Sequence, residues 1–240
     1  LVCQHGLCGS AAQVAEAMAG LAPQRWACLE CAGHGMSQMG ADPSIAGFAD
    51  DVAALVETLD PPVVLGGISM GAAIATRLAV IRPDLVRALL LVRPAWITEP
   101  APANMAPNAE VGDLMARLAP DAARAAFEGS ATAAQLAATS PDNLASLTGF
   151  FDRHPASDTA RLLTAISADG PGITTADLRA LKIPVLICAT TEDSIHPEAH
   201  AQALANLIPK AWLVRLPPKG RDKPVHLAAL AAAMARFLKE

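Results

Sequence analysis

Ser69 lies at the centre of the pentapeptide 67–71, Gly-Ile-Ser-Met-Gly, which has the pattern Gly-x-Ser-x-Gly. An apolar run precedes this pentapeptide and a run of small, helix-forming residues follows it. That is the strand–turn–helix context of a nucleophile elbow, in which a sharp turn exposes the serine hydroxyl and only small residues fit two positions away on either side. The pattern therefore predicts that Ser69 is a nucleophile. The alternative is a plain glycine turn between a strand and a helix.

A serine nucleophile needs a general base and an acid that orients this base. On an elbow of this kind the acid precedes the histidine along the chain. Asp193 follows the apolar run 183–189, which indicates a buried parallel strand, and His226 follows the next predicted strand. Because parallel strands end at the same edge of a sheet, we predict that Asp193 orients His226, which takes the proton of Ser69. Glu192 is the alternative acid.

Two backbone N–H groups are candidates for the oxyanion hole. Met70 follows the nucleophile, and Leu7 lies in a His-Gly turn after the apolar start of the chain. Backbone donors suit this task because they are already in place when negative charge develops on the substrate. We therefore predict that the N–H groups of Leu7 and Met70 form the oxyanion hole. His5 is expected to brace the turn through structural hydrogen bonds.

Three further residues are candidates for the walls of a substrate pocket. Arg93 and Trp96 follow an apolar strand and should reach the same sheet edge as Ser69. Trp96 is predicted to line the pocket, and Arg93 either meets a substrate carboxylate or pairs with an acidic side chain of the helical stretch 97–180 that follows it. His34, within a Gly-His-Gly turn, either shapes the pocket or is a structural turn residue. The other histidines, His154, His196 and His200, are predicted to lie on the surface.

Apolar strand-like and helix-like segments alternate along most of the chain. Strands are expected near 1–4, 26–29, 62–66, 86–92, 183–189 and 211–216. Helices are expected near 10–19, 44–59, 70–81, 198–208 and 226–238. This alternation predicts an α/β fold with a mostly parallel sheet and helices on both faces. Right-handed crossovers would then place the loops that carry the candidate residues at one edge of the sheet.

The alternation stops in the stretch 97–180. A proline-rich run opens this stretch, and helical segments rich in alanine follow, near 109–118, 120–128, 131–137, 141–153 and 156–167. We therefore predict an α/β core made of residues 1–96 and 181–240, with residues 97–180 as a helical insertion. The alternative is a helical decoration without ligand contacts.

The composition excludes several classes of function. The chain has 240 residues and a net charge of −5, which argues against a nucleic-acid-binding surface. No apolar run reaches the ~18 residues that a membrane-spanning helix needs. The five cysteines are scattered and odd in number, which is typical of a reducing compartment, so a cytoplasmic location is expected. Cys28 and Cys31 form a single Cys-x-x-Cys pair, which we interpret as core packing and not as a metal or redox site.

These motifs together, in this order, resemble the α/β-hydrolase fold family. The resemblance rests on the His-Gly pair at 5–6, the Gly-His-Gly turn at 33–35, the elbow at 67–71, the turn at Asp193 and His226. It implies a serine hydrolase that cleaves a small-molecule carboxylic ester, lactone or thioester through an acyl-enzyme, with no metal and no cofactor. It also implies that the helical insertion is a cap that roofs the pocket and selects the substrate.

The chain departs from the family pattern at both ends. The family usually has strands before the His-Gly strand, and here Leu1 already lies within that strand, so N-terminal strands are expected to be missing. The loop before His226 lacks the Gly-His pair that is common there. Because a fold does not fix a function, two alternatives stay open: a lyase or C–C bond enzyme on the same triad, and a ligand receptor with slow turnover.

Overall fold

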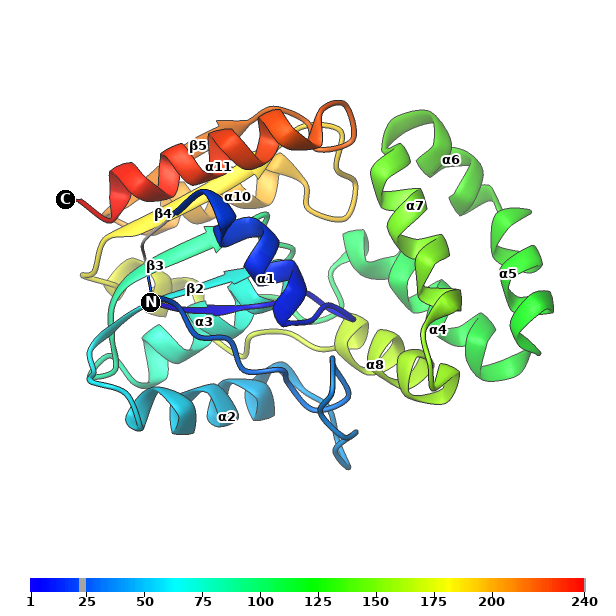
Figure 1. The fold of residues 1–240 in the computed structure, drawn as a ribbon, viewed down its shortest axis with the longest axis horizontal. Coiled ribbons are helices and arrows are strands. Elements are labelled where there is room, and N and C mark those ends of the chain that lie inside the picture. Colours follow the sequence, from blue (N-terminus) through cyan, green and yellow to red (C-terminus); the bar gives the residue numbers. More distant parts are fainter. Residues whose placement is uncertain (22–24, 240) are drawn as a thin grey trace.

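The computed structural model describes residues 1–21 and 25–239 and shows a parallel sheet with helices on both faces (Figure 1). The sheet has five strands in the order β1-β2-β3-β4-β5, and every neighbouring pair is parallel. The strands are β1 (Val2–Gln4), β2 (Val63–Ile68), β3 (Val86–Val92), β4 (Val185–Thr190) and β5 (Ala211–Leu216). The predicted α/β fold class is thus confirmed.

The two faces of the sheet pack against different helices because successive strand side chains point to opposite sides. Leu89 and Ile187 belong to one buried cluster, whereas Leu90 and Cys188 belong to the other. The first cluster includes side chains of α2 (Ile45–Glu57), α3 (Met70–Ile81) and α10 (Glu198–Leu207). The second includes side chains of α1 (Ala11–Met18) and α11 (Lys223–Phe237). Burial on both faces explains why the strands are almost uniformly apolar.

Helices occupy the chain between β3 and β4. They are α4 (Ala106–Arg117), α5 (Pro120–Glu128), α6 (Ala131–Thr139), α7 (Pro141–Gly149) and α8 (Ala156–Ala168), with 3-10 turns η2 (Ala103–Met105) and η3 (Phe150–Asp152). They lie beyond the carboxyl ends of the strands, on the right in Figure 1. The sequence predicted each of these α-helices but missed the short helix α9 (Thr175–Ala180), which closes the connection to β4.

The predicted strand at 26–29 is wrong. The structure has a single parallel bridge there, between Val2 and Ala27. Ala27 N–H donates to the Leu1 carbonyl, and its own carbonyl accepts from Cys3 N–H. The chain then leaves the sheet, because Cys31 N–H donates to a histidine ring and not to a strand. The apolar residues of this segment are thus placed by side-chain contacts and not by a strand ladder.

The elbow at Ser69 has the strained geometry that its sequence predicts. Ser69 has φ 56° and ψ −111°, in a region that residues with a side chain rarely occupy. A Cβ atom on Gly67 would lie 2.0 Å from the carbonyl carbon and oxygen of Gly71, and one on Gly71 would lie 2.4 Å from the Gln4 carbonyl oxygen. The two glycines therefore let β2, α3 and β1 approach closely enough to hold Ser69 in this conformation.

Replacement of Gly71 by alanine is expected to destabilise the protein by about 3 kcal/mol or more, since the new methyl group meets rigid backbone atoms. The matched control is Gly149→Ala, where a Cβ would meet nothing within 4 Å at the end of α7. In the helical conformation of that residue, alanine is expected to change stability by less than about 1 kcal/mol. Urea unfolding of both variants measures the difference. Equal stability of the two variants would contradict this account of the elbow.

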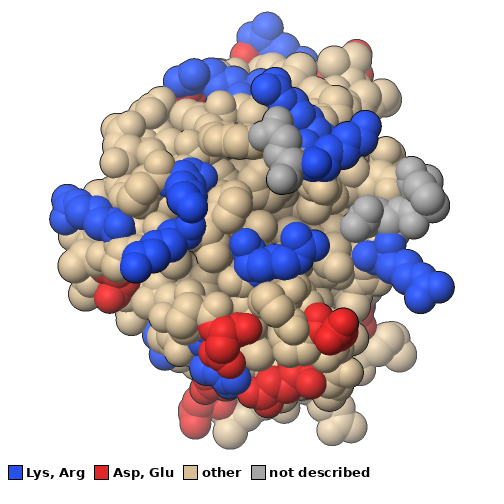
Figure 2. Space-filling model, turned by 90° about the vertical axis from the view of Figure 1, so that its left-hand side faces the viewer, with Lys and Arg blue, Asp and Glu red and all other residues tan. Residues whose placement is uncertain are grey.

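The face at the amino ends of the strands is turned away from the helical insertion. Figure 2 shows this face, with Lys and Arg side chains spread over most of it and Asp and Glu side chains gathered along its lower part. These charges are therefore remote from the carboxyl ends of the strands, where the candidate residues lie. In the described part of the chain, no helix has both the length and the apolar character needed to cross a membrane.

Candidate functional site

Ser69 is the first member of a continuous chain of three hydrogen-bonded side chains. Its Oγ lies 2.8 Å from Nε2 of His196, and Nδ1 of the same ring lies 2.8 Å from Oδ1 of Asp193. With the ring proton on Nδ1, His196 accepts from the serine hydroxyl and donates to the carboxylate. This is the arrangement in which an imidazole removes the proton of a serine that attacks a carbonyl carbon.

His196, and not His226, occupies the place next to Ser69, and this corrects the predicted base. His226 lies within α11, because Asp222 caps this helix earlier than predicted by accepting from Val225 N–H. The His226 side chain is buried, and its Nδ1 lies 2.8 Å from the Pro217 carbonyl oxygen. His196, predicted on the surface, is instead 9% exposed at the end of the turn that carries the acid.

Asp193 is held by donors from its own turn, from α7 and from Arg93, which follows β3. Its Oδ1 accepts from His196 N–H and from Asn143 Nδ2, both at 3.0 Å, and its Oδ2 accepts from Arg93 Nε at 2.7 Å. Burial alone would raise the pKa of Asp193, but the charges of His196 and Arg93 and these hydrogen bonds outweigh it and hold the pKa well below its usual value. Asp193 is therefore ionised. Glu192, the alternative acid, pairs instead with Arg221 at the surface.

The environment of His196 keeps its imidazole neutral near neutral pH. Burial lowers the pKa of His196, Asp193 raises it and the nearby charge of Arg93 lowers it, so the pKa lies below 6.5. The Nη2 atom of Arg93 is 3.2 Å from Nδ1 of His196, which places this cation directly beside the ring. A neutral ring with its Nε2 on the serine is the form that accepts a proton.

Helix α7 of the insertion fixes the turn that carries the acid and the histidine. Oδ1 of Asn143 accepts from Ser194 N–H at 2.7 Å and from Ile195 N–H at 3.3 Å. The Ser140 hydroxyl oxygen accepts from Ser194 N–H at 3.1 Å. Since Asn143 also donates to Asp193, one buried side chain satisfies both the backbone and the carboxylate of this turn.

A cavity of about 370 Å³ opens in front of Ser69 and His196. The turn at 6–9, which includes Leu7, lines one part of it, and the insertion lines another part. The apolar side chains from the insertion are Met105, Ala145, Leu147 and Phe150. Asn108 adds a buried amide whose Oδ1 has no hydrogen-bond partner in the described residues. The cavity can therefore hold a small molecule against the serine, in contact with both apolar and polar side chains.

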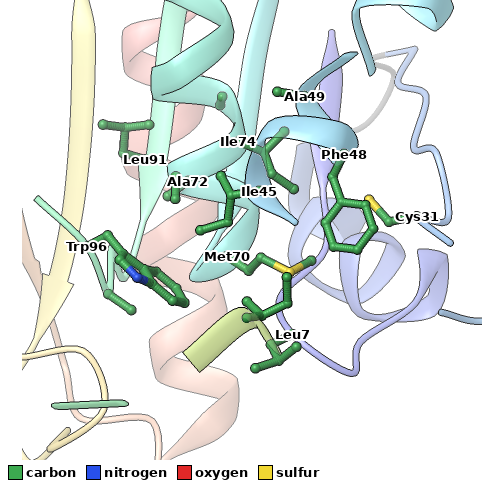
Figure 3. Packing of buried hydrophobic residues seen from close by; sticks show 14 of the residues in the cluster. Leu7, Cys31, Ile45, Phe48, Ala49, Met70, Ala72, Ile74, Leu91 and Trp96 are labelled. Carbon is green, nitrogen blue, oxygen red and sulfur yellow. The ribbon is translucent and has the colours of Figure 1, made fainter. Parts of the chain in front are cut away.

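Trp96 and His34 do not line this cavity, so their predicted place in the pocket is wrong. Trp96 packs among buried side chains near Met70 (Figure 3), and its Nε1 donates to the Asp169 carbonyl oxygen at 2.9 Å. His34 is fully buried against His5, with ring centroids 4.6 Å apart. Both side chains therefore contribute to the core, which is the structural alternative noted for His34.

Arg93 does line the cavity, as predicted, but its guanidinium group is occupied. It pairs with Asp193 at 2.7 Å, an acid of the core and not of the insertion. His5 lies behind the turn at 6–9: its Nδ1 is 2.9 Å from the Gly6 carbonyl oxygen, and its Nε2 accepts from Cys31 N–H at 3.1 Å. These contacts are those of a residue that braces the turn.

Sequence reasoning missed His196 and Asn143. The signal for His196 was its position, three residues after an acid in a turn that follows a buried strand. This spacing lets the carboxylate accept from both the backbone N–H and the ring of the same histidine. Asn143 gave no comparable signal, because it comes from a helix 50 residues earlier in the chain.

The chain belongs to the alpha/beta hydrolase fold family, whose family model matches residues 1–222. Among curated proteins, it is 33% identical over 195 residues to polyketide synthase ThaQ of Burkholderia thailandensis. That match includes 75% of this chain, and the chain spans 9% of the length of that relative.

Solved structures show the same fold. The enol-lactonase of Burkholderia xenovorans LB400 matches with a TM-score of 0.75 and 22% identity, over 100% of this chain and 90% of that one. A thermophilic esterase of Thermogutta terrifontis matches with a TM-score of 0.73 and 20% identity, over 99% of this chain and 88% of that one. At these identities the likeness concerns the fold alone, because one fold hosts many different chemistries.

Proposed function

We propose that this protein is a serine hydrolase in which Ser69 is the nucleophile, His196 the general base and Asp193 the acid that orients the base. The observation that carries the proposal is the pair of 2.8 Å contacts that joins Ser69 Oγ, the two ring nitrogens of His196 and Asp193. The strained elbow supports it, since such strain concentrates at functional residues. The depressed pKa of His196 supports it as well.

The reaction is acyl transfer in two steps. His196 takes the proton of Ser69 as the hydroxyl oxygen attacks the carbonyl carbon of the substrate, and the resulting imidazolium is stabilised by Asp193. The N–H groups of Leu7 and Met70 are proposed to donate to the tetrahedral oxyanion. His196 then protonates the leaving group, and water hydrolyses the acyl-enzyme by the same route.

The proposed substrates are small carboxylic esters, lactones or thioesters. An esterase and an enol-lactonase share the fold, and part of a polyketide synthase shares the sequence, which supports acyl chemistry in general. The helices between β3 and β4 are proposed to act as a cap, because Met105, Leu147 and Phe150 line the cavity.

A fluorophosphonate probe tests the nucleophile. We expect covalent labelling of the wild-type protein on Ser69, no labelling of Ser69→Ala, and a loss of ester turnover in this variant of about 10⁶-fold, down to the level left by binding and the oxyanion hole. Mass spectrometry of the labelled peptide and a panel of 4-nitrophenyl esters and thioesters measure the two effects. Unchanged turnover in folded Ser69→Ala would rule out the proposed chemistry.

A further inference from the structure

Among the residues that the structure describes, three basic side chains and no acidic side chain line the cavity in front of Ser69. The three are Arg93, Arg153 and Lys219. Two of them form ion pairs with acidic residues that do not line the cavity: Arg93 pairs with Asp193 at 2.7 Å, and Lys219 pairs with Asp142 at 3.1 Å. The third, Arg153, differs from these two because it has no ion-pair partner among the described residues.

Arg153 follows η3 in the insertion and reaches back to the core. Its Nη1 donates to the carbonyl oxygen of Cys8, in the turn that also carries Leu7. Its Nε is buried and has no hydrogen-bond partner in the described residues. No carboxylate of residues 1–21 or 25–239 forms an ion pair with its guanidinium group. The protein thus orients this cation at the cavity wall without neutralising it.

A partly buried cation without an acidic partner is costly, and an anion of the substrate would remove that cost. Arginine suits this task because its planar fork of N–H groups matches the two oxygens of a carboxylate. With the net charge of the chain at −5, the positive lining of the cavity is a local feature and not a reflection of overall composition.

We propose that Arg153 binds a carboxylate of the substrate, so that the preferred substrates are esters, lactones or thioesters with an anionic group away from the scissile carbonyl. This inference rests on the proposed hydrolase function, and it specifies the substrate class of the same site. At about 370 Å³ the cavity is near the lower end of the range for small-molecule sites, which favours a short acidic substrate.

Matched pairs of substrates test the inference on the wild-type protein. Mono-4-nitrophenyl glutarate carries a carboxylate on the acyl arm, and 4-nitrophenyl pentanoate has the same chain length without it. A second pair, 4-acetoxybenzoate and 4-acetoxybenzamide, places the charge on the leaving group instead. We expect kcat/KM to be about ten- to a hundredfold higher for the charged member of one pair, as for a charge-assisted hydrogen bond. Equal kcat/KM within both pairs would overturn the inference.

Variants then assign the preference to Arg153. Arg153→Gln should lose the preference, mainly through a higher KM for the charged ester, so that kcat/KM becomes similar for the two members of the pair. Arg153→Lys keeps the charge and should keep part of the preference, and it serves as the test if Arg153→Gln does not fold. Arg161→Gln, at an exposed position of α8, is the matched control. An unchanged preference in both Arg153 variants would overturn the assignment.

A binding measurement separates failure of this inference from failure of the proposed function. Isothermal titration calorimetry should detect binding of glutarate to Ser69→Ala. The dissociation constant should be about tenfold higher for the double variant that combines Ser69→Ala with Arg153→Gln. Glutarate binding without hydrolysis of any ester would count against the hydrolase alone. Hydrolysis of neutral esters without glutarate binding would count against the carboxylate site alone.

Discussion

Replacement of His196 by alanine is expected to lower kcat/KM about 10⁴- to 10⁶-fold, the loss seen when the base of a serine triad is removed. The matched variant His226→Ala should cost less than about tenfold, because His226 is bonded to the Pro217 carbonyl oxygen and not to Ser69. Both histidines are buried, so the thermal midpoints of the two variants are measured first. Hydrolysis of a small 4-nitrophenyl ester then gives the ranking. The opposite ranking would return the role of base to His226.

The pH profile provides a second readout of His196. The base must be neutral, and the pKa of His196 is lowered from 6.5 by burial and by Arg93 against the opposing effect of Asp193. The acid limb of kcat/KM is therefore expected below pH 6.5. Arg93→Gln removes a charge that lowers this pKa and should move the limb toward higher pH. A limb that stays in place in folded Arg93→Gln would show that this cation does not act on the base.

Replacement of Asp193 by asparagine is expected to lower kcat about 10⁴-fold, because the amide favours the wrong ring tautomer of His196. It also leaves the buried charge of Arg93 without its partner, which should cost about 3–5 kcal/mol of stability. Urea unfolding measures the second effect and single-turnover kinetics the first. Glu192→Gln is the control, since this residue pairs with Arg221 at the surface and should affect neither quantity appreciably. Equal losses in the two variants would contradict the role of Asp193.

The fold was largely predictable because the information lies in local patterns. The runs that form β2, β3 and β4 are apolar on both faces, and α2, which precedes β2, has its apolar residues at helical spacing. The segment near Ala27 shows the limit of this reasoning. It is apolar enough for a strand, but its hydrogen bonds go to a single bridge and to the ring of His5, and no local pattern encodes such long-range partners.

The site was predictable only in part. Ser69 and Asp193 were found because each follows a strand within a recognisable turn. The base was missed because two histidines, His196 and His226, follow strands that end at the same sheet edge, and only the capping of α11 by Asp222 decides where His226 points. Trp96 was misplaced for a related reason: proximity to the edge does not tell whether a side chain turns toward the cavity or into the core.

The acid and the histidine lie three residues apart on one turn, and this has a consequence for how the protein tolerates change. Asp193 accepts from both the backbone and the ring of His196, so their relative geometry is a local property of a single short segment. The connection 217–222 between β5 and α11 then carries no part of the proton relay. Its residues have other tasks, since Asp222 caps α11 and Lys219 lines the cavity, so changes in this connection should alter the helix and the cavity mouth and leave the acid–base pair in place.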